Sequence, residues 1–187
     1  LGKARSFYER AVQLDSHFAI AWARLSRANA QLYFLGVGNP LASHDEAKEA
    51  LENAQKLQPN SPETLLALGY YQYWMLRDYG LAKTTFKELS KLLPGRSEVP
   101  FALGLVTRRE GQWDESITYL EQALALDPRN TEMLTDVAGT YAMLRRSPVA
   151  LKLYDRALDL LPHDGVRRHA DAARRVGRRP GRPAAGA

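Results

Sequence analysis

Small and large apolar residues recur along the chain at the spacing of one helical face. A small residue is followed four positions later by a large one, three further on by Ala or Leu, and five further on by Pro. Spacings of four and three place these side chains on one side of an α-helix, and Pro cannot continue it. We therefore predict helices within the four copies of this pattern, at 47–59, 82–94, 116–128 and 150–162, and within a truncated copy at 4–11.

A second amphipathic segment precedes each of the four complete copies. In each segment a large apolar residue is followed by a small one, namely Ser26, Gly69, Gly104 or Ala138. A small residue that recurs inside a helix suggests that another helix crosses closely there, because Gly otherwise weakens a helix. Short connectors at 77–79 and 110–113 predict antiparallel neighbours. No segment alternates as a strand does, so the sequence predicts an all-α fold.

The resulting helix pair repeats about every 34 residues and resembles the tetratricopeptide repeat, whose signature is W-x2-L-G-x2-Y, A-x3-F and P. Trp22 and Leu25 match the first helix of that signature, as do the Leu-Gly pairs at 68–69 and 103–104. The resemblance spans about residues 3–164 and implies a right-handed α-solenoid of antiparallel helix pairs. One extra residue near 77–79 breaks the phase.

The repeats also predict the domain organisation. Residues 1–17 would form the second helix of a truncated repeat, with Phe7 and Val12 exposed. Residues 18–164 divide into four repeats: 18–61, 62–96, 97–130 and 131–164. Because the chain begins with Leu1 instead of Met, we expect it to be a piece of a longer protein.

Two irregular segments complete this organisation. The first repeat contains an insertion at 36–43, predicted as a loop, after which Ser43 and Glu46 would form a capping box for the next helix. Residues 165–187 are an Arg-rich tail, for which we predict a weak capping helix at 166–176 and disorder after it.

Composition narrows the chemistry. None of the 187 residues is Cys, which excludes disulfides, thiolate metal sites and cysteine nucleophiles. No apolar run approaches the roughly 18 residues of a membrane helix, so we expect no membrane partner and a cytoplasmic location. The four His form no metal-ligand motif, and no phosphate-binding loop or nucleophile motif occurs. We therefore predict a protein that is not an enzyme and has no cofactor.

The net charge of +5 is concentrated at one end. Residues 165–187 hold seven Arg and one acidic residue, Asp171, whereas residues 1–164 hold 19 basic and 20 acidic residues. Nucleic-acid binding through the tail is one alternative function, although the nearly neutral body argues against it.

The family resemblance implies that the first helices of the repeats line a concave groove that binds peptides. Projecting that face gives aromatic, apolar and Arg residues, the types enriched at binding hot spots. The predicted ligand is a protein or peptide with apolar anchors and acidic flanks. The predicted contacts are Arg24, Arg27, Leu66, Tyr70, Tyr73, Trp74, Phe101, Leu105, Arg108 and Arg109.

Alternatives remain open at this stage. Instead of contacting a ligand, the aromatic residues at 70, 73 and 74 could pack within or between repeats. We expect Tyr71 to pack in this way. Ala23 and Arg27 stand where chaperone-binding family members carry Lys and Asn, so we predict no chaperone-type carboxylate clamp. The array could also belong to a larger signalling or transcription-regulator protein, and the Ala-, Leu- and Arg-rich composition suggests a bacterial source. An uncovered helix face at the amino-terminal end is compatible with a homo-oligomer.

Overall fold

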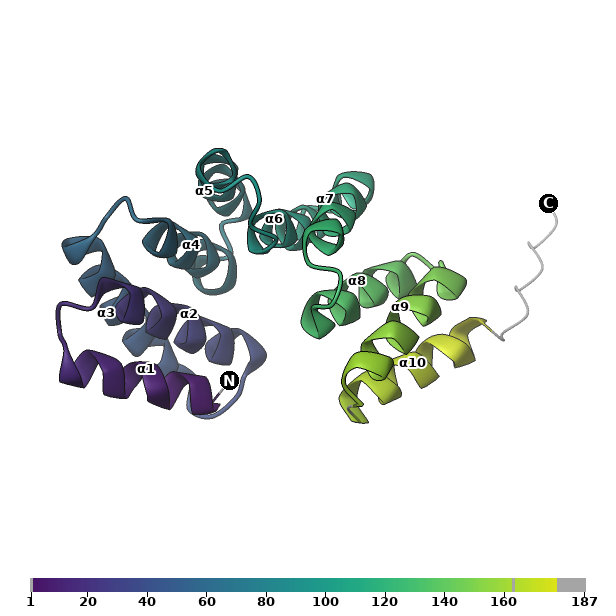
Figure 1. Ribbon diagram of the computed structural model, residues 1–187, viewed down its shortest axis with the longest axis horizontal. Helices are drawn as coiled ribbons and strands as arrows, with labels where there is room; N and C mark the ends of the chain where they lie inside the picture. The colour runs from purple at the N-terminus through teal and green to yellow at the C-terminus, as the bar shows by residue number, and fades with distance from the viewer. Residues whose placement is uncertain (1, 163, 178–187) are drawn as a thin grey trace. The chain divides into compact units, whose positions relative to one another are not determined.

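The computed structural model describes residues 2–162 and 164–177, and this part of the chain contains ten α-helices, one short π-helix and no strand. The prediction of an all-α fold built from helix pairs is therefore confirmed. The helices belong to two compact units, Leu1–Ser116 and Ile117–Ala187 (Figure 1).

The first unit is a series of packed helix pairs. Helix α2 packs against α3 and α4, and α5 packs against both α4 and α6. Its elements are α1 (Gly2–Leu14), α2 (Ala19–Leu35), α3 (Pro40–Leu57), α4 (Pro62–Tyr71), the π-helix η1 (Gln72–Leu76), α5 (Tyr79–Leu92), α6 (Glu98–Arg109) and the beginning of α7 (Trp113–Leu126).

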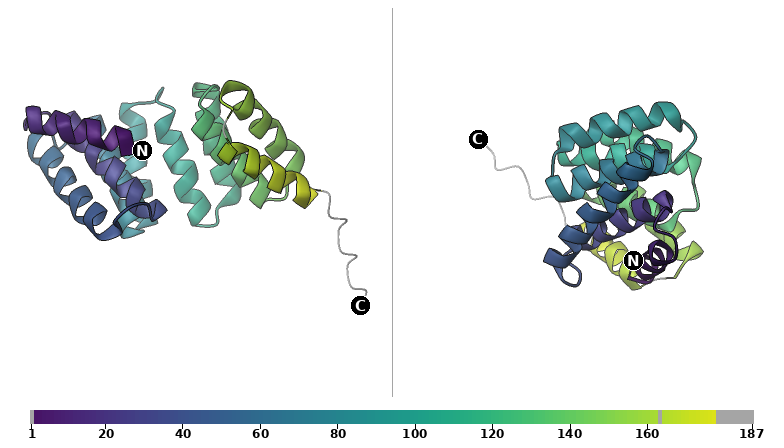
Figure 2. Two further views of the ribbon diagram at one scale, coloured as in Figure 1. Left: turned by 90° about the horizontal axis from the view of Figure 1, so that it is seen from below. Right: turned by 90° about the vertical axis from the view of Figure 1, so that its left-hand side faces the viewer.

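The second unit contains the rest of α7, then α8 (Thr131–Met143), α9 (Ser147–Leu160) and α10 (Asp164–Gly177). Helix α9 packs against both α8 and α10, and the three helices lie side by side (Figure 2). Ala170 and Ala173 of α10 are buried. A helix thus covers the segment for which a weak cap was predicted, whereas the disorder predicted beyond it falls on 178–187, outside the described residues.

The recurring small residues lie where two helices of a pair approach most closely. A Cβ atom added to Gly69 would lie 2.5 Å from the ring of Phe86, too close for any side chain. The Ser26 hydroxyl donates a 2.8 Å hydrogen bond to the Ala47 carbonyl. The predicted close crossing is therefore real, and it explains why small residues recur at these positions.

The predicted loop at 36–43 is too long, and the predicted capping box is wrong. Helix α2 continues to Leu35, and α3 begins at Pro40. The side chain of Asn39, not of Ser43, accepts the capping hydrogen bond, from the Ala42 amide. Asn at the N-cap followed by Pro in the first turn is a strong helix start, and Ser43 is consequently buried inside the helix.

The extra residue near 77–79 coincides with a change of helix type. Between α4 and α5 the chain adopts the π-helix η1, which ends at Arg77 with a left-handed φ of 54°. A π-helical turn accommodates an additional residue within a helix. The next helix of the repeat pattern, α5, then begins after Asp78. The side chain of Asp78 caps it by accepting a hydrogen bond from the Leu81 amide.

Two apolar residues of α1, Phe7 and Val12, were predicted to be exposed, and only one of them is. Phe7 is 73% exposed, as predicted, but Val12 is only 8% exposed. The predicted exposure of Val12 is wrong because this residue lies on the side of α1 that packs on α2, in a cluster with Leu25 and Ala50.

Candidate interaction surface

The ten predicted contact residues all lie in the first unit, on its first-of-pair helices. Helix α2 carries two of them, α4 two, η1 two and α6 four. Helix α2 packs against both α4 and η1. We use the name arginine–aromatic surface for the part of this face where side-chain contacts join the helices: Arg27, Phe34, Glu63, Tyr70, Tyr73, Trp74, Arg96, Glu98 and Arg109.

Aromatic rings form the packed layer of this surface. The ring of Tyr70 stacks on Trp74 with centroids 4.3 Å apart, and Phe34 lies 5.8 Å from the ring of Tyr73. Tyr70, Tyr73 and Trp74 are 1%, 2% and 6% exposed. Because they pack on one another, these three rings offer almost no area to a ligand in this structure, and they are not the exposed anchors expected from the sequence. Tyr71 is also buried, as expected.

Two arginines lie over the aromatic layer. The guanidinium carbon of Arg27 is 4.4 Å from the ring centroid of Tyr70, and that of Arg109 is 5.5 Å from the ring centroid of Phe34. Arg109 Nε also donates a 3.3 Å hydrogen bond to the Tyr73 hydroxyl. Such contacts with aromatic faces are attractive and hold the guanidinium in place. Arginines from α2 and α6 are thereby fixed on rings from α2, α4 and η1.

Two carboxylates hold Arg27 and Arg96 in a network across repeats. Arg27 Nη1 lies 2.6 Å from Glu98 Oε1, while Arg96 lies 2.7 Å from Glu98 and 2.9 Å from Glu63. Burial alone would raise the pKa of Glu98, but the charges and hydrogen bonds of Arg27 and Arg96 outweigh burial and lower it. The hydrogen bond from Arg96 is the main reason that the pKa of Glu63 is lowered as well.

The remaining predicted residues surround this network. Leu66, Phe101 and Leu105 are buried, Arg108 is half-buried and Arg24 is exposed. The charge of Arg24 contributes to the lowered pKa of Glu63. Five arginines belong to this face of the first unit, beside Glu63 and Glu98. They are Arg24, Arg27, Arg96, Arg108 and Arg109.

Four residues of the surface are absent from the ten predicted contacts: Phe34, Glu63, Arg96 and Glu98. Phe34 contacts the rings of Tyr73 and Trp74, and its place seven residues after Arg27 was a usable signal because that spacing keeps one helical face. Arg96 and Glu98 gave no comparable signal. They lie at the turn into α6, where no periodic pattern applies.

Two further observations concern the described residues only. No group of three His, Asp or Glu side chains within residues 2–162 and 164–177 is arranged to hold a metal ion. In the same part of the chain, no helix combines the length and the apolar character needed to cross a membrane.

Comparison with known proteins agrees with this architecture. Residues 101–165 match the family model described as "Tetratricopeptide repeat". The structure of TTC0263, a thermophilic TPR protein of Thermus thermophilus, has 22% sequence identity and a TM-score of 0.74, with 90% of this chain and 88% of that chain covered. YrrB, a TPR protein with an unusual peptide-binding site, has 24% identity and a TM-score of 0.56, with 91% and 83% covered.

One curated relative is a subunit of a large assembly. Anaphase-promoting complex subunit 3 of Schizosaccharomyces pombe is 24% identical over 117 residues, which are 63% of this chain and 17% of the relative. The chain thus spans about one sixth of the length of that relative. Together with the repeat pattern and the helix pairs, these matches confirm the resemblance to the tetratricopeptide repeat family and the fold that it implies.

Proposed function

We propose that this chain is a non-catalytic scaffold that binds an acidic protein or peptide segment on the arginine–aromatic surface. The observation that carries the proposal is the arrangement of Arg27 over the buried ring of Tyr70 and of Arg109 over the half-buried ring of Phe34. Their guanidinium groups are already ordered before a ligand arrives, so little side-chain entropy is lost on binding. Arginine held in this way pairs well with carboxylates.

The aromatic residues take a different role from the one expected at first. Rings that are at most 6% exposed contribute as the rigid base beneath the arginines. Apolar anchors of a ligand would then contact the edges of Phe34, which is half-buried, and the methylene stems of the arginines. Cytoplasmic location and bacterial origin remain predictions.

A selection from a random peptide library tests the proposal. The full chain is immobilised and selected peptides are measured by fluorescence anisotropy against the Arg24→Glu/Arg109→Glu variant. We expect acidic peptides with Leu or aromatic residues, and at least tenfold weaker binding to the variant. The matched control is Lys87→Glu/Lys91→Glu, which makes the same charge change on exposed positions of α5 and should bind as the unmodified chain does.

The control makes either failure informative. Equal loss in both double variants would mean that overall charge, not this surface, governs binding. Selected peptides without acidic residues, or equal binding to all three proteins, would overturn the proposal. Circular dichroism confirms beforehand that each variant is folded.

The relatives favour a second, compatible candidate: a repeat array that assembles a larger complex. The curated relative is a complex subunit of which this chain matches only 17%. In that case the partner of this chain would be a folded protein of the same complex, not a short peptide. Failure of the peptide selection combined with a stable complex isolated from cells would favour this candidate.

A further inference from the structure

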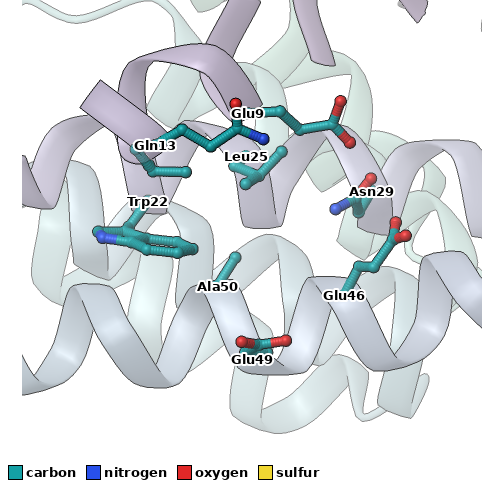
Figure 3. A pocket seen from close by; sticks show the side chains of 9 residues that line it. Glu9, Gln13, Trp22, Leu25, Asn29, Glu46, Glu49 and Ala50 are labelled. Carbon is teal, nitrogen blue, oxygen red and sulfur yellow. The ribbon is translucent and has the colours of Figure 1, made fainter. Parts of the chain in front are cut away.

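A pocket of about 290 Å³ lies on another side of α2, between α1, α2 and α3. Figure 3 shows Trp22 on one side of it and Asn29 on the other, with the carboxylates of Glu9 and Glu46 beside Asn29. Glu49, Leu25 and Ala50 also line the pocket. Since one water occupies about 30 Å³ in the liquid, the volume is ample for a side chain.

One residue of the pocket lining, Asn29, has a buried side-chain oxygen without a donor. Asn29 is 1% exposed, and its Oδ1 atom accepts no hydrogen bond. Within residues 2–162 and 164–177, one other buried side-chain atom shares this condition, Glu46 Oε2, which lines the same pocket. Glu46 Oε2 lies 2.8 Å from Arg5 Nη2 as an ion pair, but that contact lacks hydrogen-bond geometry. A buried acceptor left unmatched is unfavourable, so a ligand that donates to it gains binding energy there.

The other repeats do not leave this position unmatched. Asn29 follows the recurring small residue by three positions, as Gln72, Thr107 and Tyr141 do in the later repeats. Gln72 Oε1 accepts a hydrogen bond from Thr85, and the Thr107 hydroxyl donates to backbone carbonyls. The Tyr141 hydroxyl donates to the carboxylate of Glu121. Asn29 is thus the exception among four equivalent residues.

The fourth repeat shows what fills the equivalent space. Burial and the Glu121 carboxylate raise the pKa of Tyr141 to about 12, so its hydroxyl remains a donor. In the repeat pattern Glu121 follows Leu120 as Glu9 follows Tyr8. The acceptor Glu9 is therefore retained beside α2, but the side chain that would donate to it is replaced by the shorter Asn29.

The groups around the pocket favour a cation with several donors. Three glutamates, Glu9, Glu46 and Glu49, line it together with Asn29. Arg5 already lies 2.7 Å from Glu9 and 2.8 Å from Glu46, which leaves the cluster with an excess of negative charge. Trp22 offers a flat apolar wall on which a planar guanidinium stacks.

We propose that this pocket binds an arginine side chain from a basic segment of a partner protein, with the guanidinium donating to the carboxylates that line it and, once the Asn29 amide turns toward it, to Asn29 Oδ1. Guanidinium carries five donors in a fixed plane and therefore satisfies several acceptors at once, which the compact ammonium of lysine does less well. Arg5 shows the same chemistry within the chain, because it joins two of the three carboxylates.

A titration of the ¹⁵N-labelled full chain with N-acetyl-arginine amide tests this site. We expect saturable shifts of the Trp22 indole signal and of the Leu25 and Ala50 amides. N-acetyl-citrulline amide, which has the same shape without the charge, should bind at least tenfold more weakly. The Asn29→Tyr variant, which restores the residue type of the fourth repeat, should lose the shifts.

Further variants keep the test decisive. Glu49→Gln should weaken binding several-fold, and this variant introduces no large side chain that could disturb the fold. Glu52→Gln, on the same helix but outside the pocket lining, should leave binding unchanged. Equal shifts with the citrulline amide, or no shifts at arginine amide concentrations up to about 50 mM, near the weakest affinity that such a titration resolves, would overturn the proposal. Shifts that grow with protein concentration alone would assign the pocket to an arginine of a second copy and also contradict it.

Discussion

Helix α2 presents two surfaces that differ in sign and in how completely their polar groups are matched. On the arginine–aromatic surface, Arg27 lies over Tyr70 and pairs with Glu98. On the pocket side, Asn29 Oδ1 is buried without a donor among carboxylates. The two residues are only two positions apart, so about 200° of helix rotation separates the arginines of one surface from the carboxylates of the other.

Polar groups that are matched within the chain stabilise the fold, whereas an unmatched polar group is available to a ligand. Buried polar groups in stable structures are nearly always paired, and the network of Arg27, Glu98 and Arg96 follows this rule. Asn29 does not follow it. Changes on the first surface should therefore lower stability, whereas a change at Asn29 should leave stability intact or raise it.

The largest expected effect comes from the aromatic layer. Trp74→Ala should reduce the free energy of unfolding by about 3–5 kcal/mol, because it removes a buried stacked ring. Leu76→Ala, at an exposed position of the same π-helix, should cost less than about 0.5 kcal/mol. Urea denaturation followed by circular dichroism compares them. Similar losses in both variants would mean that the aromatic layer is not a structural base.

The ion-pair network should have a smaller, pH-dependent effect. Glu98→Gln should cost about 1–2 kcal/mol at pH 7, since it leaves Arg27 and Arg96 without their shared carboxylate. The pKa of Glu98 is lowered in the folded state, so its contribution is complete above the unfolded pKa, about 4.3, and is lost as the pH falls through the folded pKa.

Unfolding measured between pH 7 and pH 3 checks the direction of this effect. The difference between the unmodified chain and Glu98→Gln should shrink as the acid limit is approached. The same measurement on Glu88→Gln, at an exposed position of α5, is the matched control. A difference that stays constant over the range would disprove the charged network.

Filling the pocket should act in the opposite direction. Asn29→Tyr should raise the free energy of unfolding by about 0.5–2 kcal/mol, the usual gain from filling a cavity and matching its acceptors. The reciprocal change Tyr141→Asn should lower it by more than about 2 kcal/mol, because it opens a cavity beside Glu121. Thermal unfolding measures both, and a destabilised Asn29→Tyr would show that the pocket does not correspond to the space that Tyr141 fills.

The exposed arginine of α2 should matter least for stability. Arg24→Ala should change the free energy of unfolding by no more than about 0.5 kcal/mol, as surface substitutions usually do. It should nevertheless weaken an acidic peptide selected on this surface several-fold. Anisotropy titrations at two salt concentrations make the comparison, and binding that ignores both the substitution and salt would argue against an electrostatic contribution.

The sequence predicted the fold more successfully than the site. Repeating positions such as Gly69 and Phe86 record a close helix crossing that every repeat needs, so the pattern is visible along the chain. The repeat pattern also placed Arg27 and Tyr70 on one face, and in the structure the guanidinium carbon of Arg27 lies 4.4 Å from the ring centroid of Tyr70. Periodicity could not reveal that Tyr70 and Trp74 would bury each other, because a helical face that packs on a neighbour looks the same as one that contacts a ligand.

The start of α3 and the pocket were not predicted, because each depends on residues that depart from the repeat pattern. The start of α3 at Pro40 was missed because Ser43 and Glu46 offered a competing capping pattern, whereas the Asn39 cap and the following Pro start the helix earlier. The pocket depends on a single unmatched atom of Asn29, and whether a buried oxygen finds a donor is decided by side chains distant in sequence.

The most direct test of these two opposed surfaces is a pair of NMR titrations of the full chain, one with N-acetyl-arginine amide and one with a hexapeptide of alternating Leu and Glu. We expect the arginine amide to shift the signals of Trp22, Leu25 and Asn29, and the acidic peptide to shift those of Arg24, Arg27 and Phe34. The same residues responding to both probes, or the two sets exchanged, would contradict the assignment of opposite ligands to the two sides of α2.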